Sequence, residues 1–297
     1  MKTAVDCLPC FLRQSMQVAR LVGCDEGEQH RVMCRVATLL PELAMDLTPP
    51  ANAIRVYATI AAATGVADPY AALKSASNAA ALSQVVVLRP EVRRAANPLA
   101  TAMRFAIAGN IIDYGASAHF DVEAALKRSR DLPLALDHSD ALIAKIAGLP
   151  RGAAILYLAD NCGEIVYDSL LLELLAESGF ALTVAVKSGP IINDALVEDA
   201  RTAGLHDLAR IISNGTACPG TPLPNCSAEF LQVFHQADLV IAKGQGNFET
   251  LSTAEREIFF LLTIKCKVVG RHLAEISGAS PNLLPGQGEM VVYGNRC

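Results

Sequence analysis

The residues best suited to chemistry begin where the apolar segment 153–159 gives way to a polar one. The residues that follow it are Asp160-Asn161-Cys162-Gly163-Glu164. Adjacent carboxylate and amide oxygens, with a second carboxylate nearby, suit a hard cation such as Mg²⁺. An Asp or Asn after a strand also forms Asx turns and caps helices without any metal. Taken by itself, this junction leaves a metal site and a helix cap equally open.

A second junction follows the apolar segment 181–187 and ends in Asn193-Asp194. Pro190, within this stretch, fits the first turn of a helix. Ligands of an open α/β sheet bind at the carboxyl ends of the strands. Asp194 could therefore complete a metal site with Asp160 and Asn161. A capped, solvent-exposed start of a helix is the alternative.

A third junction places Lys243 at the end of a predicted strand and directly before a glycine-rich loop. The loop is Gly244-Gln245-Gly246-Asn247. Backbone N–H groups of such a loop can bind phosphate oxygens, and a lysine supplies a point charge. The loop does not match the dinucleotide-binding pattern, which requires a glycine at position 249, and it is not a Walker A loop. It therefore indicates a general anion-binding loop.

Two further segments carry candidate residues. Asn110 and Asp113, in the stretch 109–115, either belong to a loop after a helix cap or reach over the sheet into a cleft. Lys265 lies at the entrance of a predicted strand, where it is either a solvated edge residue or a phosphate ligand. The spacing of these residues does not choose between the two roles.

The pair Cys7 and Cys10 opens a predicted helix. A zinc site would prefer a second close pair or a His cluster, and a thioredoxin-like redox role would need a βαβ context. We therefore expect a structural or substrate-gating role for this pair. The cysteine count of nine is odd and indicates reduced thiols rather than a disulfide framework.

The elements that must position these residues change in character near residue 150. Apolar residues at helical spacing predict a multihelical domain over 1–150, with a cleft loop near 109–115. Apolar strands alternating with helix-length segments predict a Rossmann-like three-layer α/β/α core with a mostly parallel sheet over 151–297. The predicted helices are 8–22, 26–46, 51–64, 69–81, 89–108, 121–130, 139–148, 165–178, 191–203, 225–236 and 250–263, and the predicted strands are 153–159, 181–187, 209–213, 238–242, 266–270 and 290–293.

Composition limits the partners. Hydrophobic residues make up 52% of the 297 residues and charged residues 19%, which is enough apolar material for a large core. The net charge of -5, without basic runs, argues against binding to nucleic acid. No apolar run reaches the roughly 18 residues of a membrane span, and the first residues are too polar for a signal peptide. We therefore expect a cytoplasmic protein without a membrane partner, and its oligomeric state is left open.

Taken in order, five motifs resemble the DUF89 family, also called the damage-control phosphatases or ARMT1-like proteins. They are Cys7-x-x-Cys10, Gly109-Asn110-x-x-Asp113, Asp160-Asn161-x-Gly163-Glu164, Asn193-Asp194 and Lys243-Gly244-Gln245-Gly246-Asn247. The resemblance spans nearly the whole chain, and its cysteine pair is similar to that of the stand-alone prokaryotic branch.

The resemblance implies a helical domain packed on a Rossmann-like core and a divalent-metal-dependent phosphatase of small phosphorylated metabolites. The metal would be Mg²⁺, Mn²⁺, Co²⁺ or Ni²⁺, held by Asp160, Asn161 and Asp194. Glu164, the 243–247 loop and Lys265 would face the substrate.

The predicted reaction is hydrolysis of a phosphomonoester, in which charge neutralisation and positioning do most of the work. Asp160 and Lys243 are the predicted catalytic residues. The attacking group is either a metal-activated water or Asp160 itself. The sequence leaves two alternative functions. An S-adenosylmethionine-dependent carboxyl methyltransferase is disfavoured because the first strand of the core does not end in a glycine-rich turn, and a non-catalytic phosphometabolite-binding protein is the other possibility.

Overall fold

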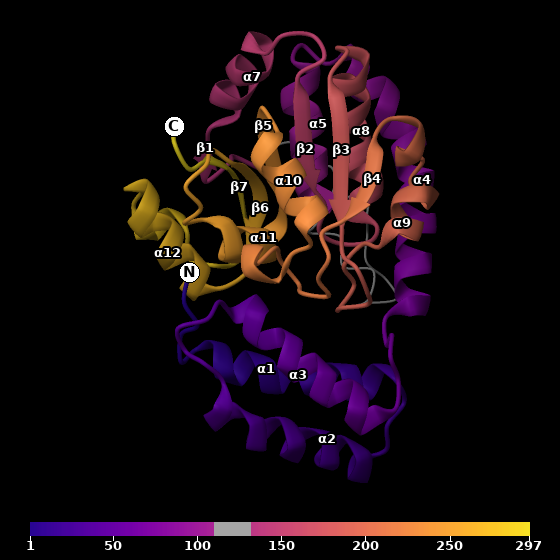
Figure 1. The fold of residues 1–297 in the computed structure, drawn as a ribbon, viewed down its shortest axis with the longest axis vertical. Coiled ribbons are helices and arrows are strands. Elements are labelled where there is room, and N and C mark those ends of the chain that lie inside the picture. Colours follow the sequence, from indigo (N-terminus) through magenta and orange to yellow (C-terminus); the bar gives the residue numbers. More distant parts are fainter. Residues whose placement is uncertain (110–131) are drawn as a thin grey trace.

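A seven-stranded sheet forms the centre of the protein (Figure 1). The computed structural model describes residues 1–109 and 132–297. The strand order is β1-β7-β6-β5-β2-β3-β4, and all neighbouring strands are parallel except β6 and β7. The strands are β1 Leu136–Asp137, β2 Ala154–Leu158, β3 Ala181–Val186, β4 Arg210–Ser213, β5 Leu239–Lys243, β6 Phe259–Ile264 and β7 Glu289–Gly294.

Successive side chains of the central strands point to opposite faces of the sheet, as the two-residue period of a strand requires. In β5, Leu239 and Ile241 pack into the hydrophobic cluster on one face, whereas Val240 and Ala242 pack into the cluster on the other. Because both faces are covered, the parallel strands form continuous apolar runs.

Helices cover both faces and produce the predicted three-layer α/β/α core, which is confirmed. Helices α4, α5, α7 and α8 contribute side chains to the first hydrophobic cluster, and α10, α11 and α12 contribute to the second. The described helices are α1 Cys7–Leu21, α2 Glu26–Leu39, α3 Pro49–Thr64, α4 Ala71–Arg94, α5 Pro98–Ala108, α7 Ser139–Gly148, α8 Glu164–Glu177, α9 Val197–Thr202, α10 Ala228–Gln236, α11 Gly244–Leu251 and α12 Lys267–Ser277, with short 3-10 turns at η1 Leu40–Glu42, η3 Leu205–Asp207, η4 Leu223–Asn225 and η5 Pro281–Leu283.

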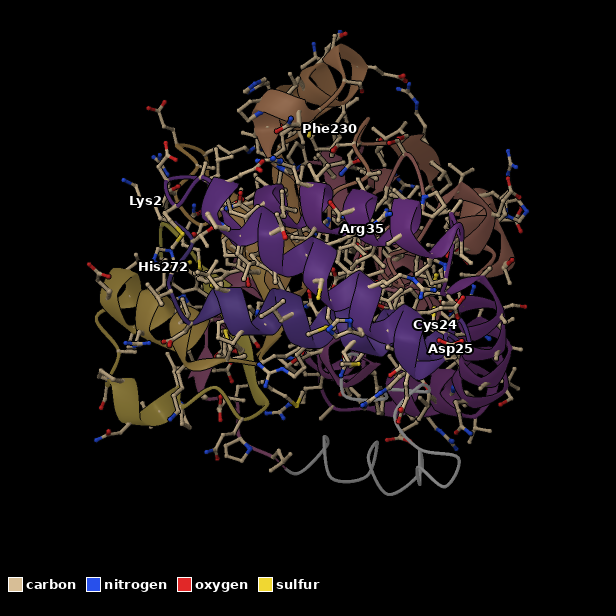
Figure 2. All side chains as sticks on the ribbon, turned by 90° about the horizontal axis from the view of Figure 1, so that it is seen from below. Lys2, Cys24, Asp25, Arg35, Phe230 and His272 are labelled. Atoms are coloured by element: carbon tan, nitrogen blue, oxygen red, sulfur yellow. The ribbon has the colours of Figure 1, made fainter. Side chains whose placement is uncertain are left out.

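Helices α1, α2 and α3 form a separate layer across one end of the sheet, drawn in indigo and purple in Figures 1 and 2. They share their own hydrophobic cluster, into which Ile191 from the loop after β3 also packs. The Cys218 thiol donates a hydrogen bond to the Pro50 carbonyl at 3.2 Å, so this layer is joined to the core by polar contacts as well. The predicted domain boundary at residue 150 stays a prediction. Helices α4, α5 and α7, which precede it, pack on the sheet.

The sequence prediction is wrong for most of residues 252–270. Strand β6, Phe259–Ile264, overlaps the last residues of the predicted helix 250–263. Helix α12, Lys267–Ser277, covers the predicted strand 266–270. All six residues of β6 are buried, and a short apolar run without alternation does not distinguish a buried strand from a helix. As a correction, Lys265 follows a strand instead of opening one.

Helix α4 also differs from the prediction, because it continues as one helix through the expected break between residues 81 and 89. Pro90 lies inside it and removes one backbone donor without ending the helix. Among the described residues, no helix combines the length and the apolar character needed to cross a membrane.

The strand order creates a crevice beside β2. The chain passes from β2 to β3 and β4 on one side and then returns to β5 on the other side. In open α/β sheets, such a reversal separates the two connections at the carboxyl ends of the strands, and ligands bind there. Asp160 follows β2, and Gly244 follows β5, so both lie at this reversal.

Candidate active site

The three predicted metal ligands meet where the segments after β2 and β3 run side by side. The Ala195 N–H donates to the Asp160 carbonyl at 2.8 Å, and the Cys162 N–H donates to the Asn193 carbonyl at 2.9 Å. Between these hydrogen bonds, Asn161 and Asp194 form an isolated antiparallel bridge. The structure therefore brings Asp194 together with the adjacent Asp160 and Asn161, although more than thirty positions separate Asp194 from them in the sequence.

A turn at Gly163 leads from this pair of segments into α8. Gly163 has a φ of 76°, which favours glycine, and its N–H donates to the Asn78 Oδ1 of α4 at 2.7 Å. The Asn161 Nδ2 then donates to the Asp160 Oδ2 at 3.1 Å and to the Glu164 Oε1 at 2.7 Å. These hydrogen bonds fix the direction of both carboxylates.

The backbone after β3 is strained beside the site. Ile192 has a φ of 46°, a left-handed conformation that is unfavourable for a β-branched residue. Its neighbour Ile191 is buried among side chains of α1, α2 and α3. Strain of this kind persists only where the surroundings impose it, and it is frequent at functional sites. Here it lies two residues before Asp194.

Gly244 allows the end of β5 to approach Asp160 closely. A Cβ atom at this position would lie 1.9 Å from the Asp160 Oδ2 and 2.2 Å from its Cγ, and the φ of Gly244 is +79°. Only glycine satisfies both conditions without displacing the carboxylate.

Lys243 is buried beneath the carboxylates and does not line the cavity that opens above them. Its side chain is 1% exposed, and its Nζ lies 3.0 Å from the Asp168 Oδ1 and 3.4 Å from the Glu164 Oε2. Burial lowers the pKa of Lys243, but the two carboxylates outweigh this effect and raise it overall. Burial raises the pKa of Asp168 to about 6. The Lys243 ammonium group therefore balances the negative charges of Glu164 and Asp168 beneath the site.

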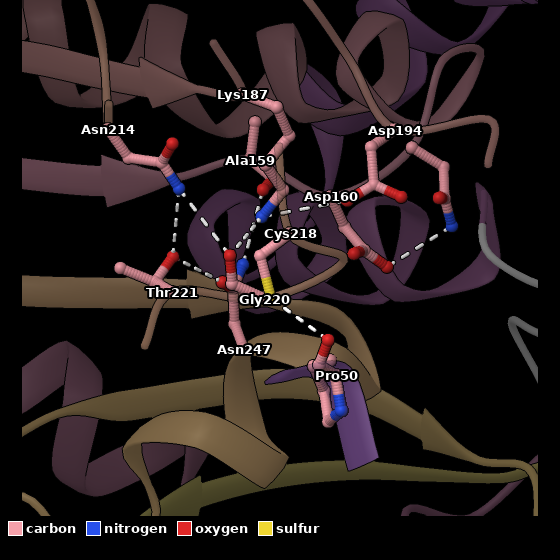
Figure 3. A network of polar contacts seen from close by, with 12 residues as sticks. Pro50, Ala159, Asp160, Lys187, Asp194, Asn214, Cys218, Gly220, Thr221 and Asn247 are labelled. Carbon is pink, nitrogen blue, oxygen red and sulfur yellow. Dashed lines mark hydrogen bonds and ion pairs between the residues drawn. The ribbon is translucent and has the colours of Figure 1, made fainter. Parts of the chain in front are cut away.

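Lys187, which directly follows β3, balances the negative charge of Asp194. Its Nζ donates to the Gly220 carbonyl at 2.9 Å and lies 3.6 Å from the Asp194 Oδ2 (Figure 3). Burial raises the pKa of Asp194 well above its ordinary value, the Lys187 charge opposes this, and the neighbouring Asp160 adds to it. One lysine thus compensates only part of the negative charge.

Asn247 joins the ends of β2 and β5. Its Nδ2 donates to the carbonyl groups of Ala159, at 3.2 Å, and Lys243, at 2.8 Å, while its Oδ1 accepts from the Thr221 hydroxyl at 2.7 Å (Figure 3). Asn247 is fully buried, and its hydrogen bonds hold the ends of β2 and β5 together beneath the crevice.

A cavity of about 860 Å³ opens above these carboxylates, between the carboxyl ends of the strands and the layer formed by α1, α2 and α3. Its floor includes Asp160, Asn161 and Asp194. Its walls include Gln245, Gly246 and Glu249 of α11, the stretch from Lys265 to Val268, and residues of α1 and α3 such as Cys7, Cys10, Arg13 and Pro50. A cavity of this size can enclose a small metabolite.

The predicted site residues fall into three groups. Asp160, Asn161, Asp194, Gln245, Gly246 and Lys265 line the cavity. Glu164, Lys243, Gly244 and Asn247 lie beneath its floor, where Glu164 and Lys243 form an ion pair, and their predicted contact with a substrate stays a prediction. Asn110 and Asp113 lie outside the described residues.

Charges along the cavity act on Asp160. Burial, followed by the Glu164 carboxylate, raises the pKa of Asp160 to about 6. Among the cations that oppose this increase, Lys265 has the largest effect, ahead of Lys187 and Lys243. The corrected position of Lys265, after β6, explains this effect because it places the ammonium group at the same edge of the sheet.

The donors on the cavity floor suit a hard divalent cation. Asp160 and Asp194 offer carboxylate oxygens, Asn161 offers an amide, and the buried Asp194 Oδ2 accepts no hydrogen bond from a described residue. Within 1–109 and 132–297, no group of three or more His, Cys, Asp or Glu side chains is arranged to hold a metal. The predicted set reaches three donors only through the Asn161 amide, whose nitrogen now faces the carboxylates. The metal therefore stays a prediction.

The sequence interpretation missed Asp168, Lys187 and Glu249. Asp168 follows Glu164 by four residues in α8, a spacing that places both on one helical face. Glu249 follows Gln245 by the same spacing in α11, and the two side chains are hydrogen-bonded at 2.8 Å. Burial raises the pKa of Glu249 to about 7. Helical spacing could have identified both carboxylates, and the end of β3 could have identified Lys187.

Comparisons with known proteins show which family the chain resembles. Residues 3–280 match the family model described as the damage-control phosphatase ARMT1-like domain. The damage-control phosphatase PH1575 of Pyrococcus horikoshii is 36% identical over 283 residues, covering 94% of this chain and 96% of the relative. A damage-control phosphatase of Archaeoglobus fulgidus is 32% identical over 280 residues, covering 92% and 96%.

A solved structure extends the similarity to three dimensions. The crystal structure of a DUF89 family protein, PH1575 from Pyrococcus horikoshii, superposes with a TM-score of 0.86. The two chains are 33% identical in this superposition, which covers 99% of each. The similarity therefore includes both the helical layer and the sheet.

Proposed function

This chain belongs to the damage-control phosphatase ARMT1-like family, and we propose that it is a divalent-metal-dependent phosphatase that hydrolyses small phosphorylated metabolites. The observation that carries the proposal is the floor of the cavity, where Asp160, Asn161 and Asp194 meet at the reversal of the strand order. A divalent cation held by these three residues would supply the positive charge that polarises a phosphoryl oxygen.

The side chains of the protein position the phosphoryl group. Lys265 lies in the cavity wall near Asp160, so its ammonium group can bind a phosphoryl oxygen. Gly244 leaves room for the Asp160 carboxylate, and Asn161 orients that carboxylate by a hydrogen bond. Lys243 and Lys187 act from beneath, because Lys243 pairs with Glu164 and Asp168 and Lys187 pairs with Asp194.

The oxygen that attacks phosphorus is either a water molecule or the Asp160 carboxylate. In the second route, a bond forms between the Asp160 oxygen and phosphorus while the bond to the leaving oxygen breaks, and water then hydrolyses the acyl phosphate. Reduction with borohydride during turnover would convert that acyl phosphate at Asp160 to an alcohol, which peptide mass spectrometry detects. An unchanged Asp160 in a reacting sample would support direct attack by water.

Phosphate release from a panel of phosphomonoesters tests the function. The protein is treated with a chelator and then supplied with Mg²⁺, Mn²⁺, Co²⁺ or Ni²⁺. We expect phosphate release that depends on the metal and is lost in Asp160→Asn. The control Asp207→Asn changes a carboxylate that is 79% exposed and does not line the cavity, and it should leave the rate unchanged. Full metal-dependent activity of Asp160→Asn would show that the site is assigned wrongly.

The same samples distinguish the other two functions. A non-catalytic binding protein would bind phosphorylated ligands after chelation and release no phosphate. A carboxyl methyltransferase would bind S-adenosylmethionine and act without a metal.

A further inference from the structure

Three cationic side chains line the cavity above its acidic floor. Arg13 comes from α1, whereas Lys265 and Lys267 come from the segment between β6 and α12. Within the part of the chain that the structure describes, their charged groups form no ion pair and no side-chain hydrogen bond. Lys187 and Lys243, in contrast, are both paired with carboxylates. The cavity wall therefore carries positive charge that is available to a ligand.

The three cations do not share one place in the cavity. Lys265 directly follows β6, and its N–H donates to the Gln245 Oε1 at 2.8 Å, which fixes the backbone at the edge of the sheet beside Asp160. Lys267 lies two residues farther on, in the first turn of α12. Arg13 belongs to the opposite wall, since α1 is part of the helical layer that covers the cavity.

The turn of α1 that carries Arg13 faces the cavity. Cys7, Cys10 and Gln14 of this helix also line it, and residues separated by three, four and seven positions share one face of a helix. Arg13 is exposed to solvent and occupies the edge of that face. Its guanidinium group can therefore reach a ligand in the cavity without losing a partner within the protein.

The size of the cavity leaves space for this second contact. At about 860 Å³, it falls in the range of sites that enclose a whole small molecule rather than one phosphoryl group. A phosphoryl group on the floor, beside Asp160 and Lys265, leaves the rest of the substrate between the two walls. The charged groups of the walls that can face this remainder include Arg13 and Lys267.

We propose that Arg13 and Lys267 form a second anion subsite, which selects phosphomonoesters that carry an additional carboxylate or phosphate away from the scissile group. This inference rests on the proposed phosphatase function. Guanidinium groups bind carboxylates and phosphates through two parallel hydrogen bonds, and such charge-assisted contacts are about twice as strong as neutral ones.

Matched substrate pairs test the subsite. 3-Phosphoglycerate carries a carboxylate where glycerol 3-phosphate carries a hydroxymethyl group, and fructose 1,6-bisphosphate carries a second phosphate that fructose 6-phosphate lacks. We expect the wild type to prefer the more anionic member of at least one pair in kcat/KM. Arg13→Gln should reduce that preference about tenfold through KM, the size expected for one charge-assisted contact, and leave the rate for the other member unchanged.

The controls separate the subsite from general effects. Arg20→Gln removes an exposed arginine from the same helix that does not line the cavity, and it should change neither member of a pair. Equal rates of the wild type for both members of both pairs would overturn the subsite, and so would an equal loss for both members in Arg13→Gln. If the wild type releases no phosphate from any compound, the proposed function fails. Calorimetric titration of the same pairs into wild type and Arg13→Gln then decides the subsite independently.

Discussion

Replacing Gly244 with alanine puts a methyl group where the Asp160 carboxylate now lies. The added Cβ would be 1.9 Å from the Asp160 Oδ2 and 2.2 Å from its Cγ, far inside any real contact distance. The carboxylate must therefore move. The φ of +79° adds a second penalty, because an alanine in the left-handed region costs roughly 1–2 kcal/mol.

Gly278 provides a matched control for the backbone term. It has a φ of +72° at the end of α12, and a Cβ there would meet nothing within 4 Å. Gly278→Ala should therefore lower the free energy of unfolding by about 1 kcal/mol from the backbone alone. Gly244→Ala should lose a further 1–3 kcal/mol or so, the usual cost of overfilling a packed region.

The two variants are compared by urea unfolding and by phosphate release. Gly278→Ala should keep the rate of the wild type. Gly244→Ala should lose roughly a hundredfold, which is the effect of displacing a reacting group by about 1 Å. If Gly244→Ala is as stable and as active as Gly278→Ala, the close approach of β5 to Asp160 does not support the site.

Two further changes probe the buried charges. Lys243→Met leaves the fully buried Asp168 without its ammonium partner, so the free energy of unfolding should fall by about 3–5 kcal/mol in urea titrations, and a loss below about 1 kcal/mol would contradict the ion pair. Burial raises the pKa of Glu249 from 4.5 to about 7, so the folded state favours the protonated carboxyl; the resulting stability is complete below about pH 4.5 and is lost as the pH rises through 7. Between pH 5 and pH 8, this loss amounts to about 2–3 kcal/mol. Glu249→Gln should reduce the pH dependence of urea unfolding by that amount, whereas an unchanged dependence would contradict the raised pKa.

The sequence predicted the floor of the cavity because each of its residues follows a strand. Asp160 comes directly after the apolar run that contains β2, whereas Asp194 ends the loop that follows β3, and parallel strands end at the same edge of a sheet. The predicted contact of Lys243 with a substrate stays a prediction, and the sequence did not indicate the ion pairs of Lys243. Its side chain turns toward Glu164 and Asp168, and a pairing across so many positions leaves no local pattern in the sequence.

The residues of the cavity walls could not be predicted from the sequence, for a different reason. Arg13 faces the cavity only because α1 packs across the end of the sheet, and neither the periodicity of α1 nor its composition indicates that packing. Lys265 was misplaced because the run Phe259–Ile264 is buried throughout and is apolar except at Thr263, so periodicity could not identify it as a strand. Tertiary packing decided both positions.

Counting bound Mn²⁺ while following phosphate release in the same sample tests the central claim most directly. The comparison uses wild type, Asp194→Asn and the exposed control Asp207→Asn after removal of metal by a chelator. We predict that wild type and Asp207→Asn bind Mn²⁺ and release phosphate in proportion to it, and that Asp194→Asn loses both. Release of phosphate by Asp194→Asn at the rate of the wild type, or by the fully chelated protein, would contradict a metal site formed by Asp160, Asn161 and Asp194.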